Sequence, residues 1–207
     1  MQQLKLDQTS IIKIAGICGI LVPIVVFTCI GLAMAHAPWF RWTHNALSDL
    51  GIESNTAALF NIGTVLGGLL TFIFSLGLIK IISNKIGAYV LSLSSLALIG
   101  IGLFPENIFI IHFIFSATFF ILLAFSLLII GLKIKQDQFE RNMGILAILF
   151  AVVAIGSTIF LIPFEGVAIS ESFVCFPAFV WCMLYGVKMA FMQNQPATFK
   201  EKQTLTT

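Results

Sequence analysis

The sequence IAGICGILVPIVVFTCIGLAMA, residues 14–35, contains 22 residues and no charged side chain. A helix of about 20 apolar residues crosses the ~30 Å hydrocarbon core of a bilayer, so this stretch is predicted to span a membrane. The triplet Ala33-Met34-Ala35 matches the cleavage pattern of a signal peptide. The apolar run is nevertheless longer than the apolar region of such peptides, about 7–15 residues. We therefore expect a retained helix.

Five more apolar stretches follow, at residues 57–79, 86–104, 108–132, 143–164 and 173–192. The whole chain is 59% hydrophobic and 10% charged, which is far from the composition of a soluble domain. We predict an all-α integral membrane protein with six transmembrane helices bundled in residues 14–192. Residues 1–13 would form a cytoplasmic N-terminal segment and residues 193–207 a disordered cytoplasmic tail.

Membrane lipids are the expected partners. The net charge of +2, with no basic aromatic patch, argues against nucleic acid. The sequence gives no indication of the oligomeric state.

The positions of lysine and arginine predict the orientation, because cytoplasmic loops carry an excess of both. With the N-terminus in the cytoplasm, ten of the eleven basic residues fall on the inner side and only Arg41 lies outside. We therefore predict a multi-pass protein of the cytoplasmic (inner) membrane with both termini in the cytoplasm. This topology places five acidic residues and all three histidines at the outer face: Asp49, Glu53, Glu106, Glu165, Glu171, His36, His44 and His112.

The segment PWFRWTHNALSDLGIESNTAALFN, residues 38–61, is the densest polar stretch between the apolar runs. Residues 43–50 are predicted to form a short interfacial helix that stops at Gly51. A Ser54-Asn55-Thr56 cluster is expected to cap the next transmembrane helix. The aromatic residues Trp39, Phe40 and Trp42 resemble the belt that anchors a chain at the headgroups.

Several polar residues would face one another at this outer end. Asn45 and Asp49 are four residues apart, as are His44 and Ser48, so each pair would share a helical face. Asn61 lies about 7 Å into the second span, where an unpaired amide costs several kcal/mol. We predict that these groups converge in one outward-facing pocket with Glu106, His112, Ser116, Glu165 and Glu171.

The pocket suits more than one chemistry. The set His44, His112, Asp49 and Glu106 could bind a divalent metal such as zinc, although no H-x-x-x-H or HExxH spacing supports it. His112 and Asp49 with Ser116 or Ser48 could act as a catalytic triad, although no G-x-S-x-G motif marks the serine.

Two further interpretations need no reaction. The pocket could bind a lipid or small molecule through Asn45, Ser48, Asn61, Glu106 and Glu165. Alternatively, the polar residues could lock the helix ends together. A transporter is disfavoured, because no ionisable residue lies near the middle of any span, where transporters bind their substrates.

Four groups of residues resemble a known family. They are Pro38-Trp39-Phe40 with Asn45-x-x-Ser48-Asp49-Leu50-Gly51, then Asn61-x-Gly63, Phe104-Pro105-Glu106 and His112-x-x-x-Ser116. Together they resemble the bacterial and archaeal membrane proteins known as domain of unknown function 998, over roughly residues 10–192. The resemblance implies a six-helix bundle with the same outer polar segment, and it implies no activity.

The function expected is therefore binding of a lipid or small molecule at the outer end of the bundle. A membrane-embedded hydrolase or transferase acting on lipid or peptide is the first alternative, so the question of enzyme activity stays open. A structural or assembly role is the second.

Overall fold

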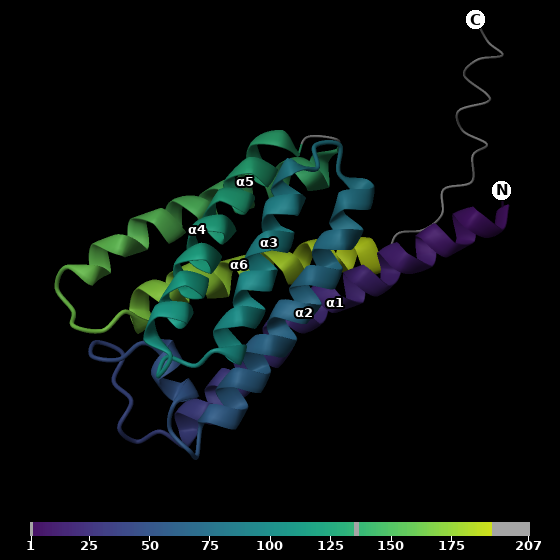
Figure 1. Ribbon diagram of the computed structural model, residues 1–207. Coiled ribbons are helices and arrows are strands. Elements are labelled where there is room, and N and C mark those ends of the chain that lie inside the picture. The colour runs from purple at the N-terminus through teal and green to yellow at the C-terminus, as the bar shows by residue number, and fades with distance from the viewer. Residues whose placement is uncertain (1, 135–136, 192–207) are drawn as a thin grey trace, which may run out of the picture.

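The computed structural model describes residues 2–134 and 137–191. Within these residues the chain forms six α-helices, two short 3-10 helices and no strand (Figure 1). The helices are α1 (Gln2–Ala35), η1 (Leu47–Gly51), α2 (Ala57–Ile81), α3 (Ile86–Leu103), α4 (Phe109–Lys133), α5 (Gln138–Gly156), η2 (Ser157–Leu161) and α6 (Ala168–Phe191). All six α-helices are long and apolar enough to cross a membrane, which confirms the predicted bundle. The predicted disordered tail, 193–207, lies outside the described residues.

Each helix packs against the next one in the sequence, and α6 returns to pack against α1. The bundle therefore has two ends. We call the end with residues 36–56, 104–108 and 162–167 the acidic end; it lies at the lower left of Figure 1. The opposite end, with residues 82–85 and the connection between α4 and α5, is the lysine end. Basic residues there include Lys13, Lys80, Lys85, Lys133, Arg141 and Lys188.

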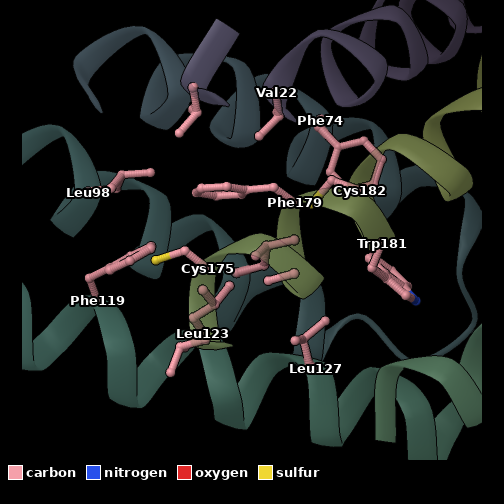
Figure 2. Packing of buried hydrophobic residues seen from close by; sticks show 14 of the residues in the cluster. Val22, Phe74, Leu98, Phe119, Leu123, Leu127, Cys175, Phe179, Trp181 and Cys182 are labelled. Carbon is pink, nitrogen blue, oxygen red and sulfur yellow. The ribbon is translucent and has the colours of Figure 1, made fainter. Parts of the chain in front are cut away.

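Helix α6 lies at the centre of the hydrophobic core. Its Phe179 and Trp181 are almost fully buried, and Phe74 of α2 packs edge-on against Trp181 with ring centroids 6.2 Å apart. Figure 2 shows these rings beside Cys175 and Cys182, which are free thiols. The indole Nε1–H of Trp181 donates to the Met143 carbonyl of α5 at 2.9 Å. A buried indole therefore has its partner.

Small residues allow a close helix contact between α1 and α6. A Cβ atom placed on Gly16 would lie 2.7 Å from the Gly186 carbonyl oxygen, and one on Gly186 would lie 2.6 Å from the Gly16 carbonyl oxygen. Membrane helices associate through such close packing, because lipid offers no hydrophobic driving force between them. These two glycines thus fix where α6 crosses α1.

Several observed helix boundaries differ from the ends of the apolar runs. Helix α5 begins five residues before the predicted 143, because Asp137 caps it by accepting a hydrogen bond from the Glu140 N–H at 2.8 Å. Helix α5 also gives way to η2 at residue 157, before the predicted end at 164. Helix α6 begins at Ala168 rather than 173. Polar residues continue a helix past its apolar run when their backbone groups are satisfied.

The predicted interfacial helix over residues 43–50 is not confirmed at that length, since the segment contains only the 3-10 helix Leu47–Gly51. Local bonds from the backbone to side chains hold this segment in turns: Asn45 Oδ1 accepts from the Arg41 N–H at 2.8 Å, and Asp49 Oδ2 accepts from the Ala46 N–H at 3.1 Å. Thr56 does precede α2, but its hydroxyl donates to the Leu50 carbonyl at 2.7 Å instead of capping the helix.

Candidate functional site: a polar-capped cavity at the acidic end

A turn between α1 and α2 supplies the first polar residues of the site. Leu47 and Leu50 of η1 are buried and anchor this turn on the bundle. Asn45 Nδ2 donates to Asp49 Oδ2 at 2.7 Å, so the predicted pair does meet. The same carboxylate oxygen accepts from the Ala46 N–H. Asp49 is thereby fixed by its own turn.

The connection between α5 and α6 packs directly on this turn. The Gly166 N–H donates to the Thr43 carbonyl at 3.0 Å, and the Ala168 N–H donates to the Asn45 carbonyl at 2.9 Å. A Cβ on Gly166 would lie 2.5 Å from that same Asn45 oxygen, so only glycine fits here. This contact brings Glu171, in the first turn of α6, close enough to accept from the Leu47 N–H at 2.6 Å.

Glu106 reaches the site from the connection between α3 and α4. It accepts a hydrogen bond at 2.8 Å from the hydroxyl of Ser48, which is 7% exposed. Burial raises the pKa of the Glu106 carboxyl, and the nearby charge of Asp49 raises it further. The hydrogen bond from Ser48 and the proximity of His112 act in the opposite direction. Glu106 therefore takes up a proton more readily than a solvated glutamate does.

His112 enters the site from the first turns of α4 and is 6% exposed. Its Nδ1 lies 2.8 Å from the Phe104 carbonyl oxygen. Since a carbonyl oxygen can only accept, Nδ1 carries the hydrogen. In the neutral ring, Nε2 is then an acceptor.

These groups border a cavity of about 670 Å³ between α4, α5 and α6. Its polar residues are Ser48, Glu106, His112, Ser116, Ser157, Thr158, Ser170 and Glu171. Its apolar wall includes Phe120, Ile121, Ala124, Phe125, Leu128 and Val174. A second void of about 50 Å³ lies behind it and shares four lining residues with it: Ser48, Ser116, Phe120 and Glu171. The cavity is therefore an apolar chamber with a polar cap.

The cavity opens sideways, on the face of the bundle that a membrane would cover. Four α4 side chains both line the cavity and are more than half exposed: Phe109, Phe113, Ile121 and Phe125. Ile155 of α5 does the same at 58% exposure. The gap between α4 and α5 is thus lined by apolar side chains that also face outward.

Helix α5 is held tightly only at the lysine end. There Gly131 of α4 faces Gly144 of α5 so closely that a Cβ on Gly131 would lie 2.6 Å from the Gly144 carbonyl oxygen. Lys188 of α6 bonds Asp137 at 2.8 Å and the buried Glu140 at 3.1 Å. Towards the acidic end these contacts give way to the cavity.

Some predicted site residues lie elsewhere. His44 is exposed. Its Nδ1 shares a hydrogen bond of 2.8 Å with the Thr43 hydroxyl, and its Nε2 lies 4.0 Å from the carboxylate of the exposed Glu165. Neither borders the cavity. Asn61 donates to the Gly51 carbonyl at 3.0 Å, and its Oδ1 is buried without a partner. Asn61 therefore supports the turn from behind and does not reach the cavity.

The proposed metal set is not assembled. Across residues 2–134 and 137–191, no three His, Cys, Asp or Glu side chains are arranged to hold a metal ion. His44 in particular lies apart from the predicted co-ligands. Of the predicted catalytic residues, His112 and Ser116 share the cavity, but His112 is oriented by a backbone carbonyl and Asp49 by its own turn.

Sequence reasoning missed the roles of Ser157 and Ser170, whose hydroxyls are 3.2 Å apart at the cavity wall. It also placed Glu171 in a loop, whereas α6 already includes it. A usable signal was present, because the run Ala168 to Cys175 has small or polar residues at helical spacing.

The fold and the cavity define a multi-pass helical membrane protein with a polar-capped apolar chamber. The family model described as "Protein of unknown function (DUF998)" matches residues 20–188. The chain belongs to this family, which confirms the resemblance seen in the sequence. Comparison with curated proteins and with solved structures finds no match.

Proposed function

We propose that this protein binds a membrane amphiphile, with the polar head at the acidic end and the hydrocarbon chain in the cavity. The observation that carries the proposal is the cavity itself: about 670 Å³, apolar along its length and polar at one end. Ligand pockets typically measure about 300–1,000 Å³ and combine apolar walls with a few polar groups.

The length of the cavity supports a long alkyl chain. Its lining on α4 extends from Phe109 to Leu128, nineteen residues apart, or about 28 Å at the helical rise. Half of a ~30 Å hydrocarbon core is about 15 Å. The chamber therefore runs deeper than one leaflet, and the opening between α4 and α5 would let a lipid enter sideways.

We further propose that the acidic end faces outward from a cytoplasmic membrane. The described basic residues of the loops and helix ends gather at the lysine end, with Arg41 at the other. The preference of lysine and arginine for the cytoplasmic side supports this orientation. The head of the ligand would then lie in the outer leaflet.

Two tryptophan variants of α5 test the binding proposal. Ile155 borders the cavity at 58% exposure, and Val152, one turn earlier, is 59% exposed and does not. Ile155→Trp should weaken binding of a pyrene-labelled dodecanol to the purified full chain by about tenfold, the equivalent of about 1.4 kcal/mol. Val152→Trp should bind like the unaltered protein. Equal binding by all three proteins would contradict the proposal and favour the structural role.

A hydrolase or transferase acting on the bound lipid is a second candidate, because Ser48 donates to Glu106, whose raised pKa suits a general base. His112 borders the same cavity. Incubation with phospholipid vesicles and mass spectrometry of the products would detect turnover. Turnover that disappears in Ser48→Ala, while pyrene-dodecanol still binds, would establish this candidate; absence of any product would leave binding alone.

A further inference from the structure

The polar cap of the cavity presents several hydrogen-bond acceptors beside a few hydroxyl groups. Glu106 and Glu171 present carboxylate oxygens, and His112 presents Nε2 because its Nδ1–H is taken by the Phe104 carbonyl. The Ser48 hydroxyl, a donor at this cap, is already bonded to Glu106. A ligand head that donates hydrogen bonds therefore fits these acceptors.

The charges of the cap have one sign. Glu171 accepts from the Leu47 N–H and Glu106 accepts from the Ser48 hydroxyl. These two carboxyl groups therefore meet neighbouring residues of η1, and Asp49 is the next residue along the same element. Among the described residues that line the cavity there is no lysine or arginine. Like charges in a partly dry site repel one another, and a cation between them relieves that repulsion.

From these two observations we infer that the ligand is a single-chain amphiphile with a primary ammonium head, such as a long-chain alkyl amine. The inference rests on the proposed binding function. An ammonium group has three donors and no acceptor, which matches the carboxylates and the His112 Nε2 at the cap. His112, which is only 6% exposed, adds a neutral acceptor beside the carboxylates. The site is therefore more than a cluster of acidic side chains.

Other head groups fit less well. A phosphate would add negative charge beside three carboxyl groups with no basic side chain to balance it. This disfavours anionic lipids, and it disfavours zwitterionic phospholipids, whose phosphate sits next to the amine. A hydroxyl head can donate a hydrogen bond but leaves the carboxylate charge uncompensated. The alkyl amine therefore satisfies both the hydrogen bonds and the charge.

Displacement of bound pyrene-dodecanol from the purified full chain at pH 8 tests the head group. The competitors are dodecylamine, dodecanol, dodecanoate and lysophosphatidylethanolamine, which separate the amine from the chain and from the phosphate. Dodecylamine should displace the probe at a concentration at least about tenfold lower than dodecanoate, as expected when charged hydrogen bonds are gained. It should also act at a lower concentration than lysophosphatidylethanolamine.

Charge-neutral variants locate the effect. Glu106→Gln and Glu171→Gln, each alone, should reduce the advantage of dodecylamine over dodecanoate by about tenfold. Glu165→Gln is the matched control, because this glutamate lies at the same end but is 85% exposed and does not border the cavity. Thermal melting identifies a variant that fails to fold. If Glu106→Gln or Glu171→Gln fails in this way, the competition result of the other variant tests the inference.

Two failures are distinguishable. If all four competitors displace the probe equally, or if the phosphate-bearing competitor acts at the lowest concentration, the ammonium inference is wrong while cavity binding stands. If none displaces the probe and Ile155→Trp leaves probe binding unchanged, the proposed function itself is wrong.

Discussion

At the scale of single residues, Glu106 is the most informative side chain of the site. It is partly buried, bonded to Ser48 and close to Asp49 and His112. Burial is the largest cause of its raised pKa, and the charge of Asp49 adds to it. Ionised Glu106 is thus an electrostatic cost in the folded protein, which a bound cation would offset.

This cost predicts the pH dependence of stability. A carboxyl whose pKa is higher in the folded than in the unfolded chain stabilises the fold when protonated. Its contribution is fully present below the unfolded pKa, near 4.5, and is lost as pH rises through the higher folded value. Glu106→Gln, which stays neutral, should therefore lose less stability than the unaltered protein between pH 4.5 and pH 7.5.

Thermal unfolding in detergent across this range measures the effect, with the exposed Glu53→Gln as a control that should follow the unaltered protein. If the stability of Glu106→Gln and of the unaltered protein changed equally with pH, ionised Glu106 would carry no electrostatic cost in the folded protein.

At the scale of elements, some helix pairs are in close contact through glycines, while others are separated by the cavity. Helices α1 and α6 touch through Gly16 and Gly186, and α4 and α5 touch through Gly131 and Gly144. Towards the acidic end, α4, α5 and α6 instead surround the cavity. The cavity therefore lies where α4, α5 and α6 lack the glycine contacts that hold helices close together elsewhere in the bundle.

Glycine variants of α1 test this packing. Gly16→Ala should lower the free energy of unfolding by about 1–3 kcal/mol, the usual cost of overpacking, because its Cβ would meet backbone atoms of α6. Gly186→Ala should do the same. Gly31→Ala on α1 is the control, since a Cβ there meets nothing within 4 Å. Unfolding midpoints measure all three, and equal stability of Gly16→Ala and Gly31→Ala would refute the α1–α6 contact.

At the scale of the whole molecule, the two ends of the bundle carry side chains of opposite charge. The acidic end carries Asp49, Glu53, Glu106, Glu165 and Glu171, while the described lysines gather at the other end. An even number of spans would put both termini on one side of the membrane. Because lysine and arginine prefer the cytoplasmic side, this division supports the proposed orientation, in which the lysine end faces the cytoplasm.

Reporter fusions test that orientation. Green fluorescent protein joined after residue 207 should fluoresce, because it matures in the cytoplasm. Alkaline phosphatase inserted after Glu53 should be active, because it requires the periplasm. The exchanged fusions serve as controls and should both be silent. The reverse pattern would place the acidic end inside and remove the proposed access from the outer leaflet.

The sequence by itself determined the six spans, the separation of charge between the two ends and most members of the polar site. These properties are local, since the length of an apolar run and the sign of a loop can be read along the chain. It also pointed to the Asn45–Asp49 pair, which is four residues apart. It overestimated the helix at residues 43–50, because side-chain bonds to the backbone compete with helix formation there.

Only the tertiary structure decided the site itself. Ser48 meets Glu106 across 58 residues of sequence, and Leu47 meets Glu171 across 124. No local pattern specifies such partners, because they depend on how the connection before α4 and the start of α6 return to the turn before α2. The cavity likewise exists only because α4, α5 and α6 approach closely at one end and not at the other, and that difference is a property of packing between helices rather than of any one of them.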